Sequence, residues 1–430
     1  MSSRIPSTLR EWWFGAVPEN WRAIPLKHLC NRYSLYGANI PAEMYESDGV
    51  RFLRTTDIGE DGTLGADGVF VPREPVAESI LAEGDFLISR SGTVGRALVY
   101  RETDGPCSYA GYLVRYVLNE KRSARWLFYV TKSAPFAVWL GASAIEATIG
   151  NVNGEKYANL VLPVPPFEFQ RAISDFLDRE TARLDALVAA KQRLLDLLAE
   201  KRKAIIATAV TRGLDPKVKL RDSGVPWLGE IPAHWGVVQS RRLFRVRNEL
   251  ARPPDRQLTA SQKYGILPQS EFVELEGRRV VELEKGVESL RHVEPNDFVI
   301  SLRSFQGGLE WSKVSGSVTF HYVVLVPIKW VHPPFFAHLF KSLPFIEALR
   351  STATLIRDGQ DLRFSHFTLV DLPVVPLEEQ RLIAAYLDRE TAKLDVARAA
   401  TERTIALLKE RRCALIAAAV TGQLPEEALN

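Results

Sequence analysis

The sequence is short of the features that mark exported and membrane-spanning proteins. Its 430 residues include three cysteines, Cys30, Cys107 and Cys413, which form neither a CxxC pair nor an even framework. Such scattered cysteines favour reduced thiols in a cytoplasmic protein. No apolar run approaches the length of a membrane span, and the first residues lack the apolar core of a signal peptide. We therefore expect a soluble, cytoplasmic chain without a membrane segment.

The motifs of nucleotide-dependent and metal-dependent catalysis are also missing. The sequence has no GxxxxGK[ST] loop, no GxGxxG after a strand and no HExxH, and its seven histidines are dispersed. Residues 331–335 (Val-His-Pro-Pro-Phe) are superficially similar to the Asn-Pro-Pro-aromatic motif of adenine-N6 methyltransferases, but His332 replaces the asparagine. We predict that the chain has no catalytic residue, no metal site and no cofactor of its own.

The charges show no large excess of either sign. Lys and Arg number 55 and Asp and Glu number 52, which gives a formal net charge of +3. A domain that binds nucleic acid unaided usually carries a clear basic patch. Binding to nucleic acid would therefore depend on local patches or on partner subunits.

What the sequence does contain is an internal repeat. Residues 162–214 align without a gap onto residues 372–424, and 30 of the 53 positions are identical. The Trp-rich segment 13–21 returns as 227–235, so the repeat also includes the region before each helical block. The predicted boundaries are a first domain at 1–161, a first long helix at 162–214, a second domain at 215–371, and a second long helix with a tail at 372–430.

Each copy of the repeated block has the pattern of a long helix. Apolar residues recur at steps that average 3.5 residues, which is typical of a coiled coil. Because neither block has an apolar face broad enough for a globular core, we expect the two helices to pair with each other; two unrelated surface helices are the alternative. A break at Asp178 and Asp388 would shorten each helix from about 66 Å to about 50 Å. The predicted interface consists of Leu184, Leu194, Leu198, Leu394, Leu408 and Leu415.

A glycine-containing loop is the best candidate for a recognition site. Residues 89–96 (Ser-Arg-Ser-Gly-Thr-Val-Gly-Arg) follow an apolar run and combine a guanidinium, hydroxyl groups and bare backbone, which suit contacts with phosphates and base edges. The alternative for Arg90 is an exposed charge paired with Asp85 or Glu83. Residues 301–308 form a matching segment in the second domain. The predicted DNA contacts are Arg54, Thr55, Ser89, Arg90, Ser91, Thr93, Arg96, Asn151, Asn153, Lys156, Arg303, Ser304, Gln306, Gln360 and Arg363.

With these motifs in place, the chain resembles the specificity subunits of Type I restriction–modification systems. The Trp-rich openings, the glycine loop and the duplicated helical block carry the resemblance over essentially all of the chain. It implies an α+β fold in which two mixed α/β target recognition domains are joined by two long antiparallel helices. The helices would form an intramolecular coiled coil, and the whole would be a pseudo-twofold repeat. Phe169 stands where the second copy has Glu379, and Leu302 stands where the first has Arg90.

The resemblance also implies partners. Each domain would read one half of a bipartite site in double-stranded DNA, and the helices would act as a spacer and as a dock for two methyltransferase subunits. Restriction subunits, which translocate and cut DNA, would join the same complex. S-adenosylmethionine, ATP and Mg²⁺ would bind to partners, and this chain would be non-catalytic. Two other classes stay open at this point: an enzyme that acts alone on DNA, and a coiled-coil scaffold that does not bind DNA.

Overall fold

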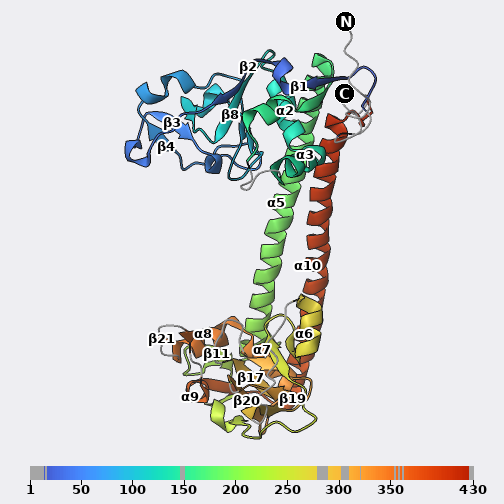
Figure 1. Ribbon diagram of the computed structural model, residues 1–430. Helices are drawn as coiled ribbons and strands as arrows, with labels where there is room; N and C mark the ends of the chain where they lie inside the picture. Colours follow the sequence, from blue (N-terminus) through green and yellow to red (C-terminus); the bar gives the residue numbers. More distant parts are fainter. Residues whose placement is uncertain are drawn as a thin grey trace. The chain divides into compact units, whose positions relative to one another are not determined.

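The protein is described by a computed structural model that covers residue 14 and residues 17–145, 151–277, 289–301, 309–319, 321–352, 355–356, 359–360 and 363–425. The chain divides into two compact units (Figure 1). The first unit comprises Met1–Gln192 and Arg403–Asn430, and the second comprises Arg193–Glu402. Each unit thus contains one globular domain together with part of both long helices.

The first unit is built around a four-stranded antiparallel sheet and a three-stranded mixed sheet. Its strands are β1 (Arg22–Pro25), β2 (Cys30–Tyr36), β3 (Val50–Leu53), β4 (Val69–Val71), β5 (Phe86–Ser89), β6 (Ala97–Val99), β7 (Cys107–Tyr109), β8 (Leu113–Leu118) and β9 (Val161–Val164). A four-stranded sheet has the order β2-β8-β5-β6, and a second sheet has the order β4-β3-β7. Strand β1 pairs antiparallel with β9, so the beginning of the domain is joined to the segment just before the first long helix.

In the described part of this domain, the helices are α2 (Ser123–Thr131), α3 (Ala134–Ile145) and α4 (Gly154–Ala158). Pro135 in the first turn of α3 cannot continue a helix from α2, and the Ser133 hydroxyl donates to the Val130 carbonyl (2.7 Å) at the junction. Trp126 of α2 is fully buried together with Phe86 of the four-stranded sheet. The helices and the sheet therefore share one hydrophobic core.

The second unit repeats this plan. Its strands are β10 (Leu220–Asp222), β11 (Glu230–Pro232), β12 (Gly236–Gln239), β13 (Phe244–Val246), β14 (Leu258–Ser261), β15 (Gly265–Pro268), β16 (Arg291–Val293), β17 (Phe298–Ser301), β18 (Glu310–Trp311), β19 (Gly316–Val318), β20 (Tyr322–Pro327), β21 (Leu355–Ile356), β22 (Gly359–Gln360) and β23 (Asp371–Val374). Its shorter helices are α6 (Gln269–Glu276), α7 (Pro333–Phe340), α8 (Leu343–Thr352) and α9 (Phe364–Phe367). The sheet β13-β20-β17-β18 corresponds to β2-β8-β5-β6, and the pair β12-β23 corresponds to β1-β9.

The two long helices are α5 (Phe167–Arg212) and α10 (Leu377–Val420), and each is continuous. The alternative of a break at Asp178 is therefore wrong, because this side chain faces the first domain. Its carboxylate accepts hydrogen bonds from Arg125 Nε (2.9 Å) and Tyr129 Oη (2.5 Å). Asp388, the equivalent residue of α10, contacts His338 Nε2 (2.8 Å). The predicted start of the first helix is also too early, since residues 161–164 form β9.

In each unit, the beginning of one long helix packs with the end of the other. Leu177 near the start of α5 and Ile416 near the end of α10 belong to the core of the first unit. Leu387 near the start of α10 and Ile206 near the end of α5 belong to the core of the second unit. The helices therefore run antiparallel in both units. This confirms the predicted fold class of two mixed α/β domains with two long antiparallel helices.

The buried side of α5 follows a heptad pattern. Its buried and half-buried positions alternate by three and four residues: Thr181, Leu184, Val188, Lys191, Leu195, Leu198, Arg202, Ile205 and Ala209. The prediction that Leu194 lies at the interface is wrong, because Leu194 is 38% exposed and the neighbouring Leu195 is half-buried. The prediction followed the spacing of apolar residues alone. It chose the wrong leucine because polar Lys191 and Arg202 also occupy interface positions. The other predicted interface leucines are buried or half-buried: Leu184, Leu198, Leu394, Leu408 and Leu415.

Two ion pairs join the helices at equivalent places of the repeat. Arg412 Nε lies 3.0 Å from Asp185 Oδ1 in the first unit. Arg202 Nη1 lies 2.9 Å from Asp395 Oδ1 in the second. Each residue of one pair is offset by 210 positions from its counterpart in the other. The internal repeat thus extends to single polar contacts.

Candidate nucleic-acid interface

The glycine loop of the first unit is a tight connection between β5 and β6. The Ser89 hydroxyl donates to the Thr93 carbonyl (2.6 Å) and accepts from the Arg96 amide (2.9 Å). Gly92 has a φ of 71° and Gly95 a φ of 84°, values that favour glycine. Ser89 is fully buried, and both hydrogen-bonding functions of its hydroxyl are used inside the loop. The predicted role of Ser89 as a DNA contact is therefore wrong, because this side chain closes the loop instead.

Arg90 lies where three segments of the first unit meet. Its amide donates to the Tyr112 carbonyl (2.9 Å), and its own carbonyl accepts from the Val152 amide (2.9 Å). Its guanidinium stacks 5.0 Å from the centre of the Tyr36 ring. A pairing of Arg90 with Asp85 is excluded in this geometry, because Asp85 Oδ2 lies 2.5 Å from Arg115 Nη2. The guanidinium of Arg90 therefore lies against an aromatic ring rather than beside Asp85.

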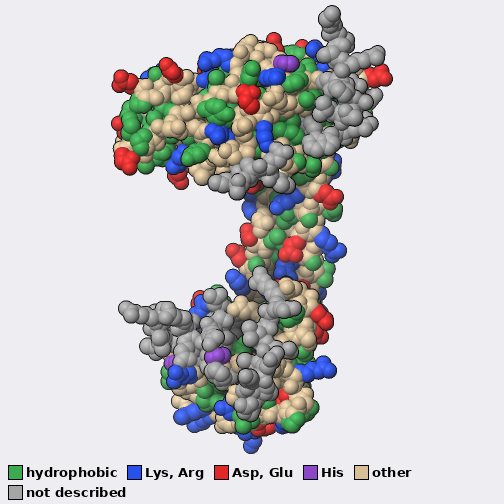
Figure 2. Space-filling view, in the orientation of Figure 1, with side chains coloured by type: hydrophobic (Ala, Val, Ile, Leu, Met, Phe, Trp, Pro, Cys, Tyr) green, Lys and Arg blue, Asp and Glu red, His purple; other side chains and the backbone are tan. Residues whose placement is uncertain are grey.

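Four of the predicted DNA contacts line one open cavity beside this loop. Its volume is about 980 Å³. The predicted contacts on its wall are Arg54, Thr55, Ser91 and Thr93. The structure therefore gathers residues from two segments that lie almost 40 positions apart in the sequence. Lys and Arg side chains are interspersed with acidic ones over the visible face of this unit (Figure 2).

Arg54 is only partly available for a ligand. Its Nε and Nη2 atoms bind the two carboxylate oxygens of buried Asp57, at 3.0 Å and 2.7 Å. This hydrogen bonding raises the pKa of Arg54 above its usual value. The remaining guanidinium nitrogen is left to contact a phosphate or a base. Thr55 contributes backbone and methyl surface, since its hydroxyl oxygen is buried without a hydrogen-bond partner.

The remaining predicted contacts of the first unit serve mainly to hold its loops together. Arg96 Nη1 donates to the Ile58 carbonyl (2.6 Å). Asn153 caps α4 by accepting the Lys156 amide at its Oδ1 atom (2.8 Å), and Lys156 Nζ donates to the Ser143 carbonyl (3.1 Å). The Asn151 Oδ1 atom is buried. Arg96 and Asn153 each use one side-chain atom to hold the fold, and their predicted DNA-binding roles stay predictions.

Sequence reasoning missed the aromatic residues of this surface. Tyr112 lines the cavity and is 64% exposed, while Tyr33 and Tyr36 on β2 are 42% and 46% exposed. Asn39 also lines the cavity. Tyrosines are frequent in cores and turns, so nothing in the local sequence distinguishes these from buried ones. The exposure of Tyr112 becomes evident only when β8 is placed beside the glycine loop.

The corresponding residues of the second unit can be placed only in part. Arg303, Ser304 and Gln306 lie outside the described residues, as does the side chain of Gln360, whose backbone forms β22. Arg363 is exposed and directly precedes α9. Its amide donates to His366 Nδ1 (3.1 Å). The predicted readout by this unit therefore stays a prediction.

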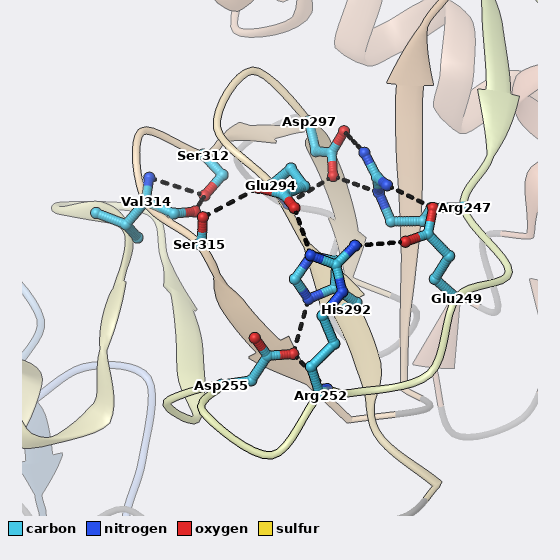
Figure 3. A network of polar contacts seen from close by, with 10 residues as sticks. All are labelled: Arg247, Glu249, Arg252, Asp255, His292, Glu294, Asp297, Ser312, Val314 and Ser315. Atoms are coloured by element: carbon cyan, nitrogen blue, oxygen red, sulfur yellow. Dashed lines mark hydrogen bonds and ion pairs between the residues drawn. The ribbon is translucent and has the colours of Figure 1, made fainter.

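A polar network occupies the second unit near β16 (Figure 3). His292 lies in its centre, with Nδ1 2.7 Å from Asp255 Oδ2 and Nε2 2.8 Å from Glu294 Oε1. Arg252 bridges Glu294 and Glu249 at 3.0 Å and 2.9 Å. Both ring nitrogens of His292 face a carboxylate, which suits an imidazolium with two N–H donors. This network ties the segment before β14 to β16.

The electrostatics of the network favour the charged histidine. Burial lowers the pKa of His292, but the hydrogen bonds to Glu294 and Asp255 outweigh this effect and raise the pKa above its ordinary value. The same contact with His292 lowers the pKa of Glu294. Among the residues that the structure describes, no group of three or more His, Cys, Asp or Glu side chains is arranged to hold a metal ion. His292 and its two carboxylate partners form a cluster of opposite charges within the second unit.

None of the helices in the described part of the chain combines the length and hydropathy of a transmembrane segment.

Comparison with known proteins shows which solved structures share this fold. No family model matches the chain. A chain from the structure entitled "Structural basis underlying complex assembly and conformational transition of the type I R-M system" matches over 95% of this chain and all of its own length. The TM-score is 0.65 and the sequence identity 17%. The HsdS subunit from Thermoanaerobacter tengcongensis matches over 95% of this chain and 98% of its own length, with a TM-score of 0.55 and 16% identity. The fold is therefore that of the S subunits of Type I systems.

Sequence relatives point to the same class. The StySPI specificity subunit of Salmonella potsdam is 23% identical over 220 residues, which is 50% of this chain and 47% of the relative. The EcoKI specificity subunit of Escherichia coli K12 is 29% identical over 210 residues, which is 47% of this chain and 45% of the relative. The matches thus span about half the length of these two curated relatives. The chain is therefore similar in sequence to Type I restriction enzyme specificity subunits.

Proposed function

We propose that this chain is the sequence-specific DNA-recognition subunit of a Type I restriction–modification complex. Each globular domain reads one half of a bipartite site in double-stranded DNA. The observation that carries the proposal is the duplicated architecture: the same sheet order and strand pairing occur twice, while the loops differ. A chain with two unlike readers on one repeated scaffold is suited to a site with two unlike halves. Exposed Tyr112 and the polar cavity that it lines supply groups that can contact bases and phosphates.

The long helices are proposed as the dock for two methyltransferase subunits, with restriction subunits completing the complex. Leu197 and Leu407 support this proposal, because they occupy equivalent positions of the repeat and are 61% and 64% exposed. Two equivalent apolar positions suit two copies of one partner. The chain itself is non-catalytic and works in the cytoplasm. S-adenosylmethionine, ATP and Mg²⁺ are bound by its partners.

The decisive experiment is methylome sequencing of a host that expresses this chain with its methyltransferase subunit. The expected result is methylation at one bipartite motif, with two specific halves and a fixed gap. Exchanging residues 31–161 for those of a related chain should change one half only. Methylation without a sequence motif, or a change in both halves after the exchange, would contradict the proposal. Tight binding of S-adenosylmethionine to the isolated chain would instead favour an enzyme that acts alone.

A further inference from the structure

The cavity of the first unit has an apolar floor and a polar rim. The floor includes Phe52 and Ala110, which are 2% and 6% exposed, with the ring of Tyr45 packed near Phe52 (ring centres 6.4 Å apart). The rim carries one amide and several hydroxyl groups, from Asn39, Thr56, Ser91 and Thr93. Ligand sites in proteins commonly show this combination of a hydrophobic lining and a few orienting polar groups.

The charges around this cavity narrow the class of ligand. Its lining residues include one basic side chain, Arg54, and no acidic one. Arg54 is already paired with Asp57, so the wall offers little net positive charge. A free anion would find too few cations here, and a purely apolar ligand would leave the rim unpaired. A neutral planar heterocycle with donors and acceptors on its edge matches both the floor and the rim.

Tyr112 adds a stacking surface at the edge of this cavity. It is 64% exposed, and its backbone is anchored directly before β8, where its carbonyl accepts the Arg90 amide (2.9 Å). An exposed aromatic ring on an anchored backbone segment can act as a stacking platform for a nucleobase that has left its own stack. The cavity volume of about 980 Å³ lies at the upper end of the range for ligand sites and exceeds the needs of one base. It therefore has room for a base together with its sugar.

We propose that the cavity receives one nucleobase drawn out of the duplex in the half-site that the first unit reads. Tyr112 stacks on the extruded base or on the bases that border the gap it leaves. The rim hydroxyls and Asn39 form hydrogen bonds with the edge of the extruded base. This inference rests on the proposed function, because it requires that the first unit binds DNA. At this position, the first unit recognises an unpaired base rather than the groove edge of an intact base pair.

The first test places a fluorescent base in the half-site. The assembled methyltransferase complex is bound to duplexes that carry 2-aminopurine or pyrrolocytosine at each position in turn, leaving out the methylated adenine. The expected result is a several-fold rise in fluorescence at one position. The rise should be lost in Tyr112→Ala and retained in Tyr33→Ala, a matched control because Tyr33 is also exposed but does not line the cavity. Since Tyr112 is largely exposed, its replacement should leave thermal unfolding unchanged.

The second test changes only the base opposite the proposed extruded one. A mispair lowers the cost of unpairing while it keeps the base that the cavity would receive. Extrusion predicts binding about tenfold tighter at this position, and this gain should disappear in Tyr112→Ala. Readout of an intact pair through the groove predicts weaker binding to the same duplex.

The outcomes separate this inference from the function on which it rests. Site-specific binding with no fluorescence rise at any position, or with weaker binding to every mispaired duplex, overturns the inference and leaves the proposed function intact. A wild-type complex that shows no site-specific binding at all overturns both.

Discussion

The first and second units share a scaffold but differ in what is added to it. In both, an aspartate closes a turn and binds an arginine. This aspartate directly precedes β5 in the four-stranded sheet of the first unit and β17 in that of the second. Asp85 accepts the Ala82 amide (2.7 Å) and pairs with Arg115 (2.5 Å). Asp297 accepts the Glu294 amide (2.8 Å) and pairs with Arg247 (2.7 Å). The aspartate occupies the same place in both units, whereas its arginine partner lies on β8 in the first unit and directly after β13 in the second. The aspartate turn therefore belongs to the scaffold rather than to recognition.

The differences concentrate in the segments around the sheet. The first unit adds the sheet β4-β3-β7, which contributes Phe52 to the floor of the cavity. The second unit instead carries the His292 network between β16 and the segment before β14. One scaffold can therefore support two chemically unlike surfaces. The following changes test where the scaffold ends and where the specialised parts begin.

The largest effect is expected at the helix interface. Leu184 is 4% exposed, so Leu184→Asp places an unpaired charge in a buried position and should destabilise the first unit by about 4 kcal/mol. The same change at Leu194, which is 38% exposed, should cost less than about 1 kcal/mol. Urea unfolding of both variants measures the difference. Equal losses would show that the heptad positions assigned to α5 are wrong.

The scaffold ion pairs come next. Asp85→Asn removes the counter-charge of largely buried Arg115 and should cost about 3 kcal/mol. Asp297→Asn leaves Arg247 with Glu249 as a carboxylate partner (2.8 Å) and should cost less than the change at Asp85. Exposed Asp67→Asn serves as a control and should stay within about 0.5 kcal/mol of the wild type. Hydrogen exchange in β5 and β17 reports the two units separately. A large loss of stability in one unit and none in the other would show that the two ion pairs do not both stabilise their units.

The sequence predicted the scaffold far better than the site. The gapless repeat and its heptad pattern were enough for two α/β domains on antiparallel helices, because apolar periodicity directly reflects burial. The glycine loop was located from its polar composition, but Ser89 and Arg96 proved to be engaged in holding the loop. Tyr112 was missed altogether. Whether a polar side chain faces solvent or its own loop depends on contacts between segments distant in sequence, which no local pattern records.

The His292 network should make the second unit sensitive to pH. The folded state raises the pKa of His292 above its unfolded value, so its contribution to stability is fully present below the unfolded pKa of about 6.5. This contribution is lost as the pH rises through the folded pKa. Amide exchange in β16 and β19 should therefore accelerate as the pH increases above about 6.5, beyond the intrinsic change in exchange rate. The groups that face the imidazole are Asp255, Glu294 and Arg252.

His292→Gln is the control for this pH effect. Glutamine keeps hydrogen-bonding capacity but does not titrate, so the excess acceleration should disappear in the variant. The first unit provides an internal reference, since β5 and β8 should show no matching change. A wild-type profile for β16 that runs parallel to that of β5 would mean that His292 does not change its charge in this range.

The smallest effect is expected at the two ion pairs between the helices. Arg202–Asp395 and Arg412–Asp185 occupy equivalent places, but their side chains are between 28% and 54% exposed, so solvent screens the attraction. Double-mutant cycles with alanine should therefore give coupling energies of about 0.2–1 kcal/mol for each pair, and both should shrink in high salt. Because the pairs are related by the repeat, the two values should agree within error. If only one pair showed coupling, the repeat would preserve the residues of this contact but not its coupling energy. Absence of coupling in both would assign the pairing of the helices entirely to their apolar positions.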